Sequence, residues 1–149
     1  MAMTTMTAVK SRLVTVLKAD SNLNGIQITY GDAGEAQRKE CIYLGDITTN
    51  QHTPETITAG RMRQLEDFEV DCFVSVQSKA GGPEACETRA GALADFIAQA
   101  LADDPQLGGT ISGLLYVRVA SMQLETIEAG IDGPRCLITI RIEAKARLS

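Results

Sequence analysis

The sequence contains few aromatic residues and no tryptophan. Phe, Trp and Tyr together make up 4% of its 149 residues. Domains that bind bases or sugars usually stack them on aromatic side chains, so this composition argues against a stacking platform. The net charge of −5 points away from phosphate backbones, because nucleic-acid-binding domains usually carry a basic patch. We therefore expect no specific nucleic-acid partner.

Signals for a metal, a disulfide, export or a membrane span are also missing. The four cysteines form no CxxC pair, and His52, the single histidine, has no Cys or second His at metal-ligand spacing. Residues 1–7 lack the basic start and apolar run of an export signal, which predicts a reduced cytoplasmic chain whose cysteines act as small hydrophobes. No apolar run approaches the ~18 residues of a membrane span. We expect no cofactor and no membrane association.

Catalytic signatures are absent as well. The turn at residues 79–82 lacks the spacing of a P-loop, and no serine lies in a G-x-S-x-G setting. The acidic run from Glu66 to Asp71 could suggest a divalent cation, but a solvated strand face explains Asp67, Glu69 and Asp71 without metal. We expect the chain not to be an enzyme.

The clearest pattern runs from residue 65 to residue 102. Even positions 68–76 are apolar and the odd ones polar except Phe73, which predicts a strand with one buried face. Gly81-Gly82-Pro83 then predicts a helix start, with Glu84 in the first turn. Apolar residues at 86, 90, 93, 97 and 101 form one helical stripe, which Pro105 ends.

The remaining chain completes a single domain over residues 1–149. We expect a loose lead at 1–6, a helix at about 7–18, and strands at 26–30, 41–47, 114–127 and 137–148. This order predicts an α+β fold: a mixed, mostly antiparallel sheet of about five strands with two helices packed on one face. The predicted core comprises Val9, Leu13, Leu17, Ile42, Leu44, Val70, Cys72, Val74, Val76, Leu93, Ile97, Leu101, Val117, Val119, Ile138, Ile140 and Ile142.

Residues 48–64 show no clean period. The segment is rich in threonine, includes His52 and Pro54, and has Arg61 and Arg63 near its end. Loops longer than about 12 to 15 residues within a domain tend to be functional or disordered, so we interpret it as a long mobile loop and a candidate partner surface. The alternative is an extended hairpin with no role, because surface loops tolerate insertions.

Two strands carry polar faces of opposite charge. The acidic and basic stripes are Asp67, Glu69 and Asp71, and Arg141, Lys145 and Arg147. If the strands are neighbours, cross-strand pairs contribute a few tenths of a kcal/mol each. If they are not, opposite stripes on two sides suit head-to-tail association into a ring. With the basic residues and the histidine of segment 48–64, these six residues form the candidate interaction surface.

Four segments together match the pattern of a known family. They are the opening helix with Val9, Leu13 and Leu17, the strand at 68–76, the turn at 78–85 with the helical stripe after it, and the closing strand that follows Gly133-Pro134-Arg135. With them the chain resembles the tail-terminator (tail-completion) proteins of long, non-contractile-tailed phages. It departs from relatives at Val76-Gln77, where an aromatic often precedes the serine that ends the central strand.

The resemblance implies a non-enzymatic virion protein. It would form a ring, usually of six copies, that caps the finished tail tube, stops its growth and offers the surface that joins the head. Its partners would be copies of itself, the tail-tube protein and the head–tail connector protein. It would assemble in the host cytoplasm and lie at the head-proximal end of the tail in the virion. Head–tail connector and neck proteins have similar small folds and are an alternative.

Two other classes of protein fit the composition. A small ligand-binding or metabolic domain would have a defined apolar pocket between sheet and helices, with a few convergent polar groups. A regulatory partner of the toxin-immunity kind would bind one protein at fixed stoichiometry and form no ring.

Overall fold

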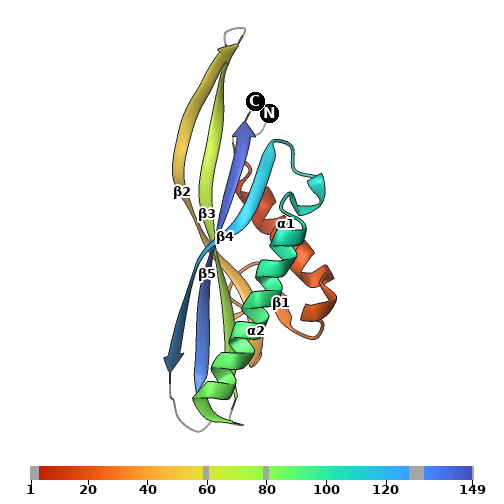
Figure 1. Cartoon of the computed structure of the whole chain (residues 1–149), viewed down its shortest axis with the longest axis vertical. Helices are drawn as coiled ribbons and strands as arrows, with labels where there is room; N and C mark the ends of the chain where they lie inside the picture. The colour runs from red at the N-terminus through yellow and green to blue at the C-terminus, as the bar shows by residue number, and fades with distance from the viewer. Residues whose placement is uncertain (1–3, 59–60, 79–80, 128–132, 149) are drawn as a thin grey trace.

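The chain folds as an open sheet with both helices on one face (Figure 1). The computed structural model describes residues 4–58, 61–78, 81–127 and 133–148, and for residues 35, 51–58 and 61–63 only the backbone is described. The sheet has five strands in the order β1-β2-β3-β5-β4. Strands β1 and β2 pair in parallel and every other neighbouring pair is antiparallel. The predicted α+β class and its mixed, mostly antiparallel sheet are confirmed.

The elements agree closely with the periodic segments of the sequence. In order they are α1 (Met6–Ala19), η1 (Ser21–Leu23), β1 (Gln27–Thr29), η2 (Gly34–Ala36), β2 (Glu40–Thr58), β3 (Arg61–Gln77), α2 (Gly82–Asp103), η3 (Leu107–Gly109), β4 (Leu114–Ile127) and β5 (Arg135–Leu148).

The core lies between the sheet and the two helices. The even positions of β3 and β5 face the helices, and Val70 and Ile142, which stand opposite each other, are both fully buried. Every residue of the predicted core is buried except Val119, which is only partly buried beside a register shift between Val119 and Ser121. Phe68 also belongs to the core, although the prediction omitted it.

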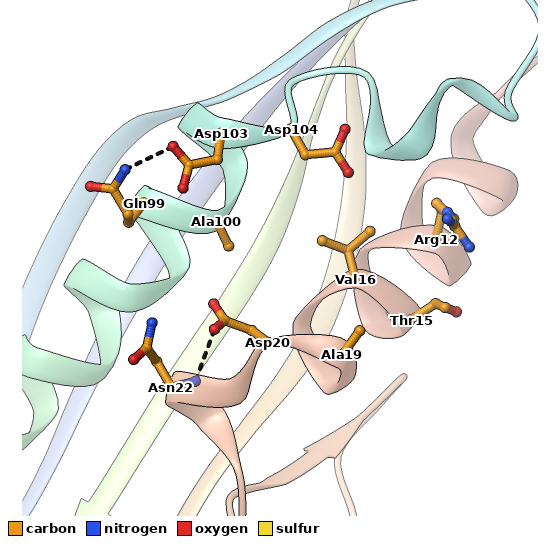
Figure 2. A pocket seen from close by; sticks show the side chains of 10 residues that line it. All are labelled: Arg12, Thr15, Val16, Ala19, Asp20, Asn22, Gln99, Ala100, Asp103 and Asp104. Atoms are coloured by element: carbon orange, nitrogen blue, oxygen red, sulfur yellow. Dashed lines mark hydrogen bonds between the residues drawn. The ribbon is translucent and has the colours of Figure 1, made fainter.

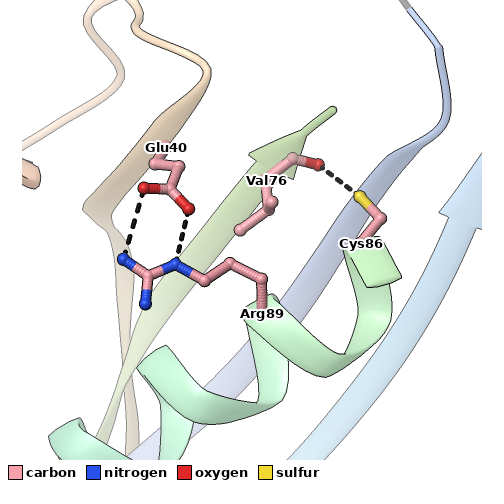
Figure 3. Close-up of polar contacts among 4 residues, drawn as sticks. All are labelled: Glu40, Val76, Cys86 and Arg89. Carbon is pink, nitrogen blue, oxygen red and sulfur yellow. Dashed lines mark hydrogen bonds and ion pairs between the residues drawn. The ribbon is translucent and has the colours of Figure 1, made fainter. Parts of the chain in front are cut away.

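Helix α2 begins at the predicted glycine pair and is fastened to the sheet by its first turns. Gly81 has φ of 79°, and a Cβ there would come within 2.6 Å of the Ala85 side chain, so glycine is required. The Cys86 thiol donates to the Val76 carbonyl at 3.2 Å, and the Arg89 guanidinium binds Glu40 at 2.6 Å (Figure 3). These contacts join α2 to β3 and β2 at one end of the sheet.

The interpretation of residues 48–64 as a loop is wrong at the level of secondary structure. Strand β2 continues to Thr58 and β3 starts at Arg61, so the segment belongs to a long hairpin. The register shifts at three places in β2, between Leu44 and Ile47, between Thr49 and Gln51, and between Pro54 and Thr56. Each bulge moves the side chains by one position, which hides the period of two that a regular strand would show.

Candidate assembly surface

The β2–β3 hairpin extends beyond the rest of the sheet (Figure 1). Strand β3 pairs with β5 as far as the row of Gln64 and Leu148. Past that row, Thr56–Thr58 pairs only with Arg61–Arg63, and we call these two segments the hairpin tip. The candidate residues Arg61 and Arg63 are therefore in the tip, and their side chains lie outside the described residues.

His52 lies away from the hairpin tip. The register puts it opposite Glu66, several rows closer to the body of the sheet. The structure thus does not bring this histidine together with Arg61 and Arg63 in one row, and the side chain of His52 also lies outside the described residues. No pairing partner for its imidazole follows from the backbone.

The two charge stripes are neighbours within one chain. The register of β3 and β5 puts Asp67 opposite Lys145 and Asp71 opposite Arg141. The Arg141 Nε atom lies 4.0 Å from the Asp71 Oδ1 atom. Both stripes occupy the sheet face that the helices leave open. The geometry therefore matches the cross-strand alternative, and the stripes do not lie on opposite sides of the molecule as a charge-driven ring would require.

Glu143 extends this charged face to β4, a connection that the sequence reading missed. Its carboxylate accepts from Arg118 Nη2 at 2.7 Å and from the Tyr116 hydroxyl at 3.3 Å. The carboxylate raises the pKa of Arg118. Because Glu69 is the cross-strand neighbour of Glu143 in β3, the pairing with Arg118 also offsets a like-charge contact.

Glu66 is a buried carboxylate that ties the start of α1 to β3. Its side chain is fully buried, and its Oε1 atom accepts from the Thr5 amide at 2.9 Å and from the Thr5 hydroxyl at 2.8 Å. Its Oε2 atom accepts from the Thr4 hydroxyl. A carboxylate at this position also faces the positive end of the α1 dipole. The sequence did contain a signal, since residue 66 has the same parity as the buried positions 68–76.

This contact corrects the expectation of a loose lead at residues 1–6. Thr4 and Thr5 are held by Glu66, and α1 already begins at Met6. Hydrogen bonds to the carboxylate satisfy the Thr5 amide, a donor that would otherwise be unpaired ahead of the first helical turn. Residues 1–3 lie outside the described residues.

An aromatic pair packs on a glycine of the open face. Tyr43 and Phe73 are cross-strand neighbours whose rings stack with centroids 5.0 Å apart. A Cβ on Gly45 would lie 2.6 Å from Phe73 Cε2. Phe73, the exception to the alternation in the sequence, is thus explained by a contact on the polar face, and Gly45 leaves room for its ring.

The four cysteines are free and buried, which agrees with their interpretation as small hydrophobes. Burial raises the pKa of the Cys72 thiol to about 12, so this thiol stays protonated at neutral pH. No cluster of three or more His, Cys, Asp or Glu side chains able to hold a metal ion occurs among the described residues.

The described hollows differ in where they lie on the fold. One of about 360 Å³ separates the ends of α1 and α2 and includes Asp20, Asp103 and Asp104 in its wall (Figure 2). Another of about 490 Å³ runs along the outer side of α2 beside Ala85 and Arg89. Neither of these two lies between the sheet and the helices, but a third hollow, of about 260 Å³, lies between α2 and β4 beside Leu101 and Val117. It is smaller than most ligand pockets, which occupy about 300 to 1,000 Å³.

In the described part of the chain, no helix is both long enough and apolar enough to span a membrane. No protein-family model and no curated protein sequence matches this chain. Among solved structures, the chain is similar to a chain from the virion of a native gene transfer agent (GTA) particle. The two share 14% identity with a TM-score of 0.63 over 98% of this chain and 99% of the other. At this identity the likeness establishes a shared fold over the whole length.

Proposed function

We propose that this chain is a structural protein of a phage-like virion that forms a ring, with six copies as the expected number. In this proposal the ring caps the tail tube, stops its elongation and provides the surface that joins the head. The observation that carries the proposal is the full-length likeness to a chain of a gene transfer agent virion. It agrees with the family that the sequence pattern resembles.

The architecture supports assembly as the role of the chain. The sheet is open, with β1 at one edge and β4 at the other, so each copy has two strand edges available for contacts. The hairpin tip projects from the body of the sheet (Figure 1). A projecting hairpin can reach a neighbouring protein without any change in the core.

A position at the head–tail connector is the second candidate, because the virion likeness is to one chain of a whole particle and agrees with either location. The two differ in partner. A tail terminator binds the end of the tail tube, whereas a neck protein binds the connector and leaves tube growth unaffected.

The proposal is tested first on the purified chain, by light scattering after size exclusion and by negative-stain microscopy at low and high concentration. We expect rings with a fixed copy number at high concentration. A chain that stays monomeric at every concentration contradicts the ring.

The tube-capping role needs a second measurement. Purified tail-tube protein of the same particle is polymerised with and without the chain, and tube lengths are measured by microscopy. We expect shorter tubes that carry a ring at one end. A variant that lacks residues 56–58 and 61–63 removes the hairpin tip but no core residue, and serves to ask whether the tip contacts the tube. Unchanged tube lengths with the full chain favour the neck position.

A further inference from the structure

The large apolar side chains that the described residues leave exposed are concentrated at the two edges of the sheet. Tyr30 is 44% exposed and directly follows β1, the first edge strand. Met122, Leu124 and Ile127 are 44%, 46% and 56% exposed, and all three lie in β4, the other edge strand. Exposed apolar residues gathered on unpaired strand edges mark sites of association.

The residues at the two edges lie in the same rows of the sheet. Ile28 pairs with Ile42, Ile42 with Val74, Val74 with Ile138, and Ile138 with Leu124, so one continuous row crosses all five strands. By the same register, Thr29 is level with Gln123, and Gln27 is level with Glu125. One residue further on, Tyr30 is level with Met122.

The strand directions are also compatible. Strand β1 runs parallel to β2, and the three antiparallel steps from β2 to β4 make β4 antiparallel to β1. A second copy rotated about an axis along the strands would therefore present its β1 antiparallel to β4 of the first copy. Its helices would remain on the same face of the joined sheet.

Only part of β4 is open for such pairing. The Val117 amide donates to the Pro105 carbonyl at 2.8 Å, so the connection after α2 covers the first half of the strand. Residues 121–127 pair with β5 in an unbroken register. By contrast, the stretch of β2 beyond β1 carries bulges and Pro54, devices that protect an edge from pairing.

The charges beside the two edges are complementary. At β1, the Lys10 Nζ atom lies 4.2 Å from the centre of the Tyr30 ring, and the Arg38 amide donates to the Gln27 side chain at 2.8 Å. At β4, Glu125 is exposed, and Glu87 of α2 accepts from the Thr126 hydroxyl at 2.5 Å. Asp32, a carboxylate in the connection after β1, already accepts from the Gly34 amide.

We infer that β1 of one copy adds to residues 123–125 of β4 in the next copy, so that the sheets of neighbouring subunits join head to tail. Tyr30 then covers Met122, a favourable contact between an aromatic ring and a thioether, and Leu124 packs beside Ile28. The partner is a second copy of this chain, and this choice rests on the proposed function. The surface itself is defined by register, exposure and charge.

Cross-linking tests the register directly. Within one chain, four strand spacings separate Thr29 from Gln123, about 19 Å, which is too far for a disulfide. In the joined sheet they are direct cross-strand neighbours. The variant with Thr29→Cys and Gln123→Cys should therefore give a ladder of covalent oligomers on mild oxidation. The native cysteines are buried and compete little.

Three control variants make the outcome specific. Thr29→Cys alone should give no ladder, and Thr29→Cys with Ile127→Cys, four residues out of register, should cross-link far less. Covalent dimers from Gln123→Cys alone would mean that β4 pairs with β4, which overturns the inference. Assembly without any ladder overturns it too, but leaves the proposed ring standing. A chain that neither assembles nor cross-links overturns both.

A surface substitution gives an independent measure. Leu124→Lys puts a cation on an exposed site that would face the apolar Ile28 of the neighbour, on the same edge as Lys10, and it should raise the concentration needed for assembly by about tenfold or more. Ser112→Lys, on an exposed connector residue, should leave that concentration unchanged. Equal assembly of both variants contradicts the inference.

Discussion

At the scale of single residues, most positions are explained by which face of an element they occupy. Ile140 of β5 is fully buried and pairs with Cys72 of β3 on one side and Met122 of β4 on the other, while its neighbour Arg141 points to the open face. Glu66 shows that burial and polarity are compatible when every buried oxygen finds donors, here from Thr4 and Thr5.

The burial of Ile140 leads to a stability prediction. Ile140→Ala removes buried methyl and methylene groups and leaves a cavity, so we expect the free energy of unfolding to fall by about 2 to 5 kcal/mol. Denaturant titration measures the change. The half-exposed Leu124 is the control, since Leu124→Ala should cost well under 1 kcal/mol in the monomer. An unchanged midpoint for Ile140→Ala would contradict the register of β5.

At the scale of elements, the pairing of the strands determines which side chains meet on the open face of the sheet. The hairpin of β2 and β3 bends and twists at its bulges, and the open face of the same strands carries both an aromatic pair and the charged rows. Contacts on this face are therefore specific to pairs of strands, and each can be tested by its own substitution.

Gly45 tests the aromatic contact. Gly45→Ala pushes a methyl group into the Phe73 ring, and since that ring is held against Tyr43 we expect a loss of about 1 to 3 kcal/mol in unfolding free energy. Gly31→Ala is the matched control, because nothing lies within 4 Å of a Cβ there. The two substitutions are compared by urea titration. Equal effects would show that the Phe73 ring moves aside without any loss of unfolding free energy.

The charged rows give a prediction opposite to that of a charge-driven ring. Because Asp71 already faces Arg141 within the chain, Arg141→Glu with Arg147→Glu should lower monomer stability by about 0.2 to 1 kcal/mol through loss of the Asp71–Arg141 pair. The concentration needed for assembly should not change. Adding Asp71→Arg should recover part of the stability. Loss of the oligomer from a folded double variant would show instead that the open face is the subunit interface.

At the scale of the whole molecule, the sheet of a single subunit ends in two edge strands, β1 and β4, whose residues lie in the same rows of the register. Joining copies would satisfy the backbone groups of residues 123–125 and cover Met122 and Leu124 of β4. A head-to-tail contact of this kind closes into a ring when the rotation between copies allows it. The core under the helices needs no change for this to occur.

Assembly of native subunits should stabilise the fold by mass action. We expect the thermal midpoint to rise by several degrees over about a hundredfold increase in protein concentration, because only the native chain would join the proposed ring. Scanning fluorimetry across a dilution series measures it. Leu124→Lys should flatten the dependence without lowering the midpoint of the dilute chain. A flat series for the unchanged chain would contradict assembly in this range.

The sequence by itself determined the elements whose patterns are local. The period of two in residues 136–146 is enough to identify a strand and its buried face, and Gly81-Gly82-Pro83 is enough to start α2, because both depend only on neighbours along the chain. The predicted core and the α+β class follow from the same short-range signals.

Only the tertiary structure decided which strands are neighbours. The charge stripes could have lain apart or together, and it was the register between β3 and β5, set by long-range packing, that put Asp71 beside Arg141. The strands of residues 48–64 stayed hidden because each bulge in β2 resets the phase of the pattern. The alignment of Ile28 and Leu124 in one row of the sheet likewise exists only once all five strands are paired. Pairing between distant segments leaves no periodic pattern in the sequence of either segment.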